Sequence, residues 1–234
     1  EVKCASLCAQ LEEDVYMRLP PGVEGSGCLK LKKSLYDLPE APKLFAAHFA
    51  KSIQEIGFVR SELERCLHTR SRSGGHVDLT IIWVDDALMS VKDMSEADKV
   101  VTALRRVYKL TDQGLVKEFL GIKVTMAPGK ITLSQEGCSR ELVTKYGFLD
   151  SKRVATPLPQ GCMLLKPEDK TEDQDPDYRK ADLTKYQRIV GSLLYLSTTT
   201  RPDLSCATSQ LSRFCADPRS AHMRAAKHTL RHLS

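Results

Sequence analysis

The sequence lacks the marks of secreted, membrane-spanning and zinc-ribbon proteins. Its 8 cysteines are scattered and none stands in a CxxC pair, so neither a zinc ribbon nor a disulfide framework is indicated. No apolar segment approaches the roughly 20 residues of a membrane helix, and no signal peptide opens the chain. Glu1 stands where an initiator Met would, which predicts a fragment with an upstream start. We expect an intracellular protein with reduced thiols and no membrane partner.

A large excess of charge of one sign is also missing. The 35 Lys and Arg residues against 30 Asp and Glu leave a formal net charge of +5. This balance permits a polyanionic partner without requiring one. The apolar fraction of 41% allows a hydrophobic core, and 234 residues suffice for one large domain or two small ones.

One stretch stands out, the apolar run 79–90 with two adjacent carboxylates inside it. Its β-branched and aromatic residues favour strands, which predicts a hairpin that turns near 84–86. Asp85 and Asp86 would repel each other by roughly 1–4 kcal/mol at about 4 Å. A Mg²⁺ ion would remove this repulsion, because it binds one or two carboxylates together with substrate phosphates. An ordinary solvated turn explains the same residues, so both interpretations stay open.

Periodicity and turn residues predict the other elements. A strand at 15–17 ends in Pro-Pro-Gly, and a helix after the hairpin begins at a capping box formed by Ser95 and Asp98. Residues 150–182 have no periodicity and read as an acidic, solvated linker. Further strands are expected over 66–70, 77–83, 119–126 and 131–134, and further helices over 43–56, 136–146, 183–197, 203–215 and 220–233.

Two basic regions have competing interpretations. The lysines of segment 28–42 lie beside Ser34 and Tyr36, which suits a phosphate backbone next to a stacking ring, but lysines also protect edge strands from aggregation. From Arg201 onward six Lys and Arg face two Asp, which indicates either a solvated helix face or contact with a nucleic-acid backbone. His228 and His232 have a spacing that can hold a metal, without a carboxylate or Cys at matching distance.

Several short motifs follow one another along the chain. They are VYM-x-x-P-P-G, LKKSLYDLPEAP, WVDD, FLGIKV, LSQ, TPL, YQRIVGSLLYLSTTTRPDLSCA, LSRF and AAKHTLRHL. In this order and spacing the chain resembles the reverse transcriptase of copia-type long-terminal-repeat retrotransposons, from its first residue to its last. The resemblance implies an α+β fold with a polymerase palm, an antiparallel sheet packed on helices, over 1–149. It places the linker at 150–182 and a helical thumb or connection at 183–234, with the fingers largely missing.

The implied reaction is RNA-directed DNA synthesis. A primer 3′-OH attacks the α-phosphate of a deoxynucleoside triphosphate, and two Mg²⁺ or Mn²⁺ ions hold the attacking and leaving oxygens. The implied partners are an RNA template, a DNA primer and dNTPs, with integrase, RNase H and protease as other polyprotein domains, in a cytoplasmic particle or the nucleus. The family motifs assign catalysis and metal binding to Asp85, Asp86 and Glu1, nucleotide or template binding to Ser6, Lys33, Ser34, Leu35, Tyr36 and Asp37, and the primer side to Phe119, Leu120 and Gly121.

Departures from the family pattern leave a second hypothesis open. Glu1 stands at a catalytic Asp position, Ser6 replaces a Phe that crowds the sugar 2′ position, and Asp37 replaces a Gly. Trp83 replaces the Tyr of the usual Tyr-Val-Asp-Asp motif. The chain can accordingly be a degenerate remnant that keeps its fold and binds nucleic acid. A metal-dependent nuclease or phosphohydrolase would need a further cluster of metal ligands, which the spacing does not offer.

Overall fold

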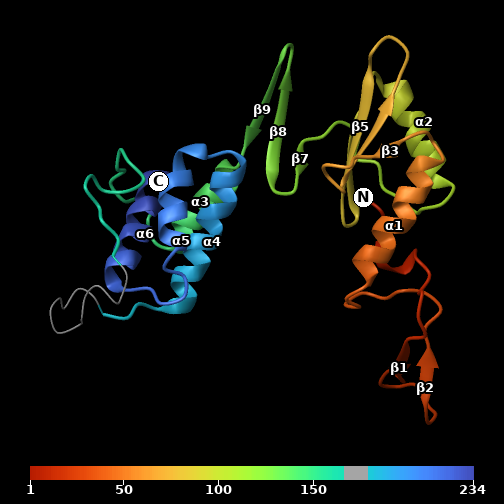
Figure 1. The fold of residues 1–234 in the computed structure, drawn as a ribbon, viewed down its shortest axis with the longest axis horizontal. Coiled ribbons are helices and arrows are strands. Elements are labelled where there is room, and N and C mark those ends of the chain that lie inside the picture. Colours follow the sequence, from red (N-terminus) through yellow and green to blue (C-terminus); the bar gives the residue numbers. More distant parts are fainter. Residues whose placement is uncertain (166–178) are drawn as a thin grey trace. The chain divides into compact units, whose positions relative to one another are not determined.

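The computed structural model describes residues 1–165 and 179–234, which form two compact units (Figure 1). The first unit comprises Glu1–Val116 and the second Lys117–Ser234. Each unit is closed around its own cluster of buried apolar side chains. Among the residues described, no helix is both long and apolar enough to cross a membrane.

The first unit combines a two-stranded ribbon with a four-stranded sheet and two helices. Strands β1 and β2 pair antiparallel, and β3-β4-β5-β6 form an antiparallel sheet in chain order. The elements are the 3₁₀ turn Ala5–Leu7, β1 (Tyr16–Arg18), β2 (Cys28–Lys30), α1 (Ala41–Gln54), β3 (Val59–Arg60), β4 (Leu67–Ser71), β5 (Val77–Trp83), β6 (Asp86–Ser90) and α2 (Met94–Arg105).

One face of the four-stranded sheet is covered by α1 and α2, and the other is open. Strand β5 alternates strictly, so that Ile82 is buried whereas Leu79, Ile81 and Trp83 are exposed. The apolar stripes of the two helices meet the covered face because their side chains recur at three- and four-residue spacing. The resulting core contains Val2, Ala5, Phe45, Phe49, Ile53, Phe58, Ile82, Val100, Leu104 and Tyr108.

A charged network ties the β4–β5 hairpin to the start of α2. The Asp78 side chain is completely buried, and its Oδ2 accepts hydrogen bonds from Arg70 Nη2 at 2.8 Å and Arg72 Nε at 2.6 Å. Both guanidinium groups also face Glu96 in the first turn of α2. Burial alone would raise the pKa of Asp78, but the hydrogen bonds from Arg72 and Arg70 lower it below its ordinary value.

Helix α2 begins two residues earlier than the sequence predicts. The N-cap is Asp93, whose carboxylate accepts the backbone N–H of Glu96 at 3.0 Å and the hydroxyl of Ser95 at 2.8 Å. The predicted capping box of Ser95 and Asp98 is therefore wrong. An ionised carboxylate is a stronger acceptor for the free N–H groups of the first turn than a hydroxyl, which accounts for the difference.

The second unit is a small antiparallel sheet followed by a helical bundle. Strands β7, β8 and β9 pair in chain order. One core joins α3 to the helices near the C-terminus, because Leu142 packs in the same cluster as Tyr186, Leu211 and Leu230. The elements are β7 (Glu118–Phe119), β8 (Ile122–Ala127), β9 (Lys130–Ser134), α3 (Glu136–Lys145), α4 (Leu183–Thr199), the 3₁₀ turn Pro202–Leu204, α5 (Ser205–Ser212) and α6 (Ser220–Leu233).

Two expectations for this unit need correction. The single strand predicted over 119–126 is broken after Phe119 by the two-residue turn Leu120–Gly121. Of the segment predicted as a solvated linker, residues 166–178 lie outside the described residues. The part before them is packed, since Leu158 and Leu164 are partly buried against the core and Pro157 O accepts a hydrogen bond from Thr229 Oγ1 at 2.9 Å. The domain boundaries at 149 and 182 stay predictions.

Most other elements agree with the sequence. The helices and antiparallel sheets fit the predicted α+β class, and the hairpin of β5 and β6 turns where the carboxylates suggested. The stretch predicted as one helix over 203–215 is a 3₁₀ turn followed by α5. All eight cysteines are free thiols.

Candidate functional site

The turn between β5 and β6 presents the two adjacent carboxylates. Trp83 pairs with Asp86, so the loop consists of Val84 and Asp85. Val84 has a φ of 53°, a left-handed conformation that is a genuine outlier for a β-branched residue. Asp85 is exposed and Asp86 is half-buried. Backbone strain of this kind costs of order 1–3 kcal/mol and tends to cluster at functional sites.

The first residues of the chain lie against this turn. The backbone N–H of Val2 donates to the carbonyl oxygen of Asp85 at 2.7 Å. On the other side, Thr111 N–H donates to Glu1 O at 2.9 Å and the amino group of Glu1 donates to Thr111 O at 3.1 Å. Backbone contacts alone therefore bring residue 1 next to Asp85, two positions that are far apart in the sequence.

Tyr108 anchors the strand-like segment on which Glu1 rests. Its side chain is buried and stacks on Phe49, with ring centroids 5.4 Å apart. Its hydroxyl lies 2.6 Å from His48 Nδ1 and 3.0 Å from Ser52 Oγ. Burial raises the pKa of Tyr108 to about 12, so the phenol stays neutral. This anchor fixes the position of Thr111, three residues further on.

The segment that was predicted to meet the nucleotide packs against residues 4–9. Ser34 is fully buried, its N–H donates to Ala9 O at 3.1 Å, and its hydroxyl donates to the carbonyl oxygen of Ser6. Tyr36 is 59% exposed. Partial desolvation raises the pKa of Tyr36, and the neighbouring thiol of Cys4 and carboxylate of Asp85 raise it further. Segment 34–36 thus packs on residues 4–9, and Tyr36 lies close enough to the Asp85 turn to sense its charge.

Unusual backbone geometry is concentrated in the segments that the sequence singled out. Among the residues described, the non-glycine residues with positive φ are Cys4 at 55°, Asp37 at 67°, Val84 at 53° and Leu120 at 50°. Asp37 occupies the position of a family Gly, and its φ lies in the region that glycine adopts without strain. Neither Cys4 nor Val84 carries a sequence signal of this conformation, so sequence reasoning missed both.

The carboxylates fit a cation only in part. Over residues 1–165 and 179–234, no three His, Cys, Asp or Glu side chains come close enough together to hold a metal ion, so Glu1, Asp85 and Asp86 do not form a complete ligand set. Within the same residues neither Asp85 nor Asp86 forms a side-chain hydrogen bond or ion pair, which leaves their oxygens available. Two carboxylates suffice for Mg²⁺ when substrate phosphates and water complete its shell.

Lys33 lines a separate pocket of the first unit. A pocket of about 670 Å³ is bounded by residues 7–12, Lys33 and the side of α1 that carries His48 and Lys51. Burial raises the pKa of the Cys8 thiol, and the charge of Lys33 opposes that shift. Neither Asp85 nor Tyr36 lines this pocket. The structure thus places Lys33 beside the site but on a different surface from the carboxylates.

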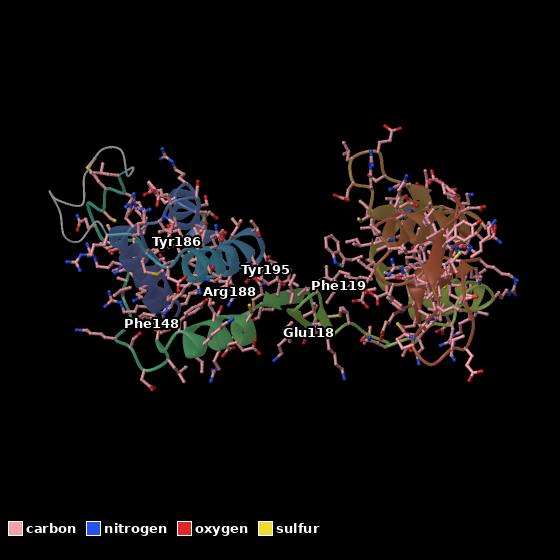
Figure 2. The ribbon with its side chains drawn as sticks, turned by 90° about the horizontal axis from the view of Figure 1, so that it is seen from below. Glu118, Phe119, Phe148, Tyr186, Arg188 and Tyr195 are labelled. Atoms are coloured by element: carbon pink, nitrogen blue, oxygen red, sulfur yellow. The ribbon has the colours of Figure 1, made fainter. Side chains whose placement is uncertain are left out.

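The predicted primer-side residues belong to the second unit. Leu120 and Gly121 form the turn between β7 and β8, and both have positive φ, 50° and 74°. Two-residue hairpin loops with two left-handed residues match the twist of their strands. The hydroxyl of Tyr195 on α4 donates to the carbonyl oxygen of Leu120 at 2.5 Å. Figure 2 labels Tyr195 and Phe119, the residue before this turn. No sequence pattern indicated this contact.

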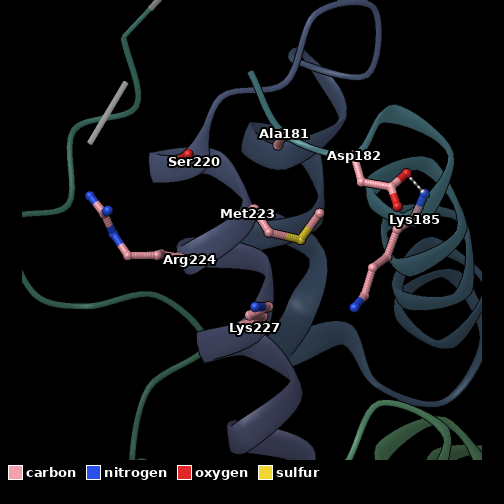
Figure 3. Close-up of a pocket in the computed structure, with 7 residues that line it drawn as sticks. All are labelled: Ala181, Asp182, Lys185, Ser220, Met223, Arg224 and Lys227. Atoms are coloured by element: carbon pink, nitrogen blue, oxygen red, sulfur yellow. Dashed lines mark hydrogen bonds between the residues drawn. The ribbon is translucent and has the colours of Figure 1, made fainter. Parts of the chain in front are cut away.

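A basic pocket lies between the starts of α4 and α6 (Figure 3). Its volume is about 340 Å³, and Lys185, Arg224 and Lys227 line it. The one acid in the lining, Asp182, caps α4 by accepting the N–H of Lys185 at 2.9 Å. Such a surface suits the phosphates of a nucleic-acid backbone.

The paired histidines of α6 face different backbone groups. His228 Nε2 lies 3.1 Å from Thr156 O, and His232 Nδ1 lies 3.0 Å from Val154 O. The second nitrogen of His232 is 3.2 Å from Asp203 Oδ2. Both rings hold segment 154–156 against the bundle, and no metal cluster is found within the described ranges.

Comparisons with known proteins point to one family. A family model described as reverse transcriptase (RNA-dependent DNA polymerase) matches residues 1–160. The whole chain is 33% identical to the transposon Ty5-1 protein of Saccharomyces cerevisiae, of which it covers 74%. It is also 31% identical to the retrovirus-related Pol polyprotein from transposon TNT 1-94 of Nicotiana tabacum and 32% identical to that from transposon RE1 of Arabidopsis thaliana. It spans only 18% and 16% of these two proteins. No solved structure matches the chain.

Proposed function

Because the chain belongs to the reverse transcriptase (RNA-dependent DNA polymerase) family, we propose that it extends a DNA primer along an RNA template within a retrotransposon Pol polyprotein. The family match and the transposon relatives confirm the predicted resemblance to copia-type elements. Nucleotidyl transfer at the Asp85 turn is the proposed chemistry.

The hydrogen bond between Val2 and Asp85 carries the proposal. At 2.7 Å it holds the position of the family's first catalytic acid, Glu1, next to the turn that bears the other two. An active site assembled from distant segments requires such a contact, and here it joins the segment in which Glu1 stands at the position of a family Asp to the turn that carries the Asp-Asp pair. The strained φ of Val84 at the same point adds support.

Each segment of the site has a distinct task in this proposal. Asp85 and Asp86, with Glu1 beside them, would hold a divalent cation, which when bound supplies Lewis-acid stabilisation of the phosphoryl oxygens. The exposed ring of Tyr36 is available for stacking on a base, and the cation of Lys33 for a phosphate. The hydroxyl of Ser34 is already bonded to Ser6 O, so Ser34 positions the chain rather than touching the substrate.

The second unit would bind the nucleic acid. Lys185, Arg224 and Lys227 form a cationic surface that suits backbone phosphates, and the Leu120–Gly121 turn would face the primer end. RNA template, DNA primer and dNTPs are the partners proposed. The Pol polyprotein relatives motivate the further proposal of integrase, RNase H and protease domains as neighbours.

Primer extension on an RNA template tests the proposed function. Purified protein containing residues 1–234 is expected to add dNTPs to an annealed DNA primer in the presence of Mg²⁺ or Mn²⁺. Chelation of the metal with EDTA should abolish extension. The carboxylates are negatively charged, so without the cation nothing offsets the negative charge that develops on the phosphoryl oxygens. The readout is primer length on a denaturing gel. Extension that persists in EDTA would contradict metal-assisted transfer.

A degenerate remnant is the second candidate, and the conformation of Asp37 favours it. An Asp with a φ of 67° at a glycine position adds a charge and strain within the site. The triple variant Glu1→Asp, Ser6→Phe and Asp37→Gly is expected to extend primers at least about 10-fold faster, since small displacements of reacting groups are costly. Asp37→Gly alone should not lower the free energy of unfolding. A triple variant no faster than the parent would show that these three residues do not limit the reaction.

A further inference from the structure

The side chain of Tyr195 reaches from α4 to a turn 75 residues earlier in the chain. Its hydroxyl donates a hydrogen bond of 2.5 Å to the carbonyl oxygen of Leu120. The Tyr195 side chain remains 41% exposed, so apolar burial alone does not account for its placement. The contact therefore points to the turn itself as the reason for a tyrosine at this position.

The turn that Tyr195 contacts is poorly specified by its own sequence. Leu120 has a φ of 50°, a conformation that Gly, Asn and Asp adopt far more readily than Leu. The ladder beside the turn is short, because β7 pairs with β8 through Glu118 with Lys123 and Phe119 with Ile122, and one further backbone bond, from Val124 N–H to Lys117 O at 2.8 Å, continues it. Neither local preference nor the strand pairing holds Leu120 firmly, so a tertiary contact must contribute.

Gly121 is fitted to the same hydroxyl. A Cβ atom at this position would lie 3.2 Å from Tyr195 Oη, closer than most such contacts, and the φ of Gly121 is 74°. Both residues of the turn are thus matched to one atom of α4, Leu120 by a hydrogen bond and Gly121 by the absence of a side chain. This double match distinguishes the contact from an incidental surface hydrogen bond.

We propose that Tyr195 is a positioning residue that fixes the Leu120–Gly121 turn in the geometry in which it meets the primer end. The proposal rests on the proposed function, in which Phe119, Leu120 and Gly121 of the second unit contact the primer. The residue does not touch the reacting atoms. Its hydroxyl acts through the carbonyl oxygen of Leu120, and the rigid helix α4 supplies the reference against which the turn is held.

The chain offers a matched control on the same helix. The hydroxyl of Tyr186 also donates to a backbone carbonyl, that of Leu211, at 2.8 Å, but it lies in the core of the bundle. Tyr186→Phe and Tyr195→Phe therefore remove the same atom, from the same helix and from the same kind of bond. Only Tyr195→Phe removes a bond to the turn.

Hydrogen–deuterium exchange tests whether Tyr195 holds the turn. In Tyr195→Phe the amides of residues 118–127 are expected to exchange about 3- to 10-fold faster, the change that loss of one neutral hydrogen bond produces. In Tyr186→Phe, the exchange rate of residues 118–127 divided by that of the bundle helices should be the same as in the parent. Equal exchange of residues 118–127 in the two variants would overturn the proposal.

Primer extension tests whether the held turn matters for the reaction. In Tyr195→Phe we expect kcat to fall about 3- to 10-fold with the KM for dNTP within twofold, because the primer end and not the nucleotide is displaced. Gly121→Ala should act in the same direction, and Tyr186→Phe should leave both constants within twofold where it is folded. Faster exchange without a change in kcat would overturn the positioning role. A parent protein that extends no primer would instead overturn the proposed function, and the exchange comparison would still decide whether Tyr195 holds the turn.

Discussion

Replacement of Asp85 by Asn is expected to lower the rate of primer extension at least about 100-fold. Loss of a group that merely orients a metal ligand already costs 10- to 100-fold, so loss of the ligand itself should cost more. The amide keeps the size of the side chain and removes its charge. Because the Asp85 side chain is exposed and without a side-chain partner among the described residues, the free energy of unfolding should stay within about 0.5 kcal/mol of the parent.

The combination of the two measurements is decisive for Asp85. Single-turnover primer extension gives the rate, and urea unfolding gives the stability of the same samples. Asp98→Asn is the control, since Asp98 is also exposed in the first unit but lies on α2, away from the turn. It should keep the parental rate within twofold. If Asp85→Asn extended primers at the parental rate, the turn would not be the catalytic centre.

Replacement of Asp78 by Asn is expected to have the opposite profile, a large loss of stability. The carboxylate is fully buried and holds Arg70 and Arg72, whose side chains are 17% and 25% exposed. Removal of one member of a buried ion pair leaves the remaining charges without compensation, which costs about 3–5 kcal/mol. We expect about 3 kcal/mol, because both arginines retain some access to water and Glu96 remains beside them. Urea unfolding of the first unit measures this change.

A second ion pair supplies the comparison for Asp78. Asp14 pairs with Lys30 at 2.7 Å, but both side chains are more than half exposed, so Asp14→Asn should cost no more than about 1 kcal/mol. A loss of similar size in the two variants would show that burial does not govern the contribution of Asp78.

The pH dependence of stability follows from the lowered pKa of Asp78. In the folded protein this carboxyl loses its proton more readily than in the unfolded chain, whose pKa is near 3.8. Its contribution is therefore complete above about pH 4 and is lost as the pH falls through the lower pKa of the folded state. Asp78→Asn should remove the loss of unfolding free energy that protonation of Asp78 causes. Unfolding curves of parent and variant, recorded from pH 5 down to the pH at which the parent unfolds, measure this difference.

Hydrophobic periodicity was sufficient to predict most elements of both units. The apolar residues of α1 recur at helical spacing, and the run 79–83 has strand composition, so local pattern and packing agree. The break at Leu120–Gly121 escaped prediction because an apolar Leu before a Gly reads as a continuing strand. Its left-handed backbone depends on a tyrosine 75 residues away, and no local pattern contains that information.

Sequence motifs nominated the residues of the candidate site, but they could not indicate how its segments are brought together. Motif order singled out Glu1, Tyr36 and Asp85, and the structure brings their segments together. The backbone contacts that do so, from Val2 and Thr111, depend on atoms that every residue has, so sequence cannot reveal them. The sequence marked Asp37 as a replacement of a family Gly that adds a side chain and a charge, and its left-handed backbone became visible only in the structure.

The hydrogen bond from Val2 to the Asp85 turn joins two backbone groups, and this has a consequence for which mutations the fold tolerates. This contact does not require the carboxylate, because the backbone of Val2 can bond to the turn whichever side chain residue 85 carries. A variant of residue 85 would thus lose the proposed chemistry and keep this backbone contact. A related chain that keeps this fold therefore need not keep the proposed reaction.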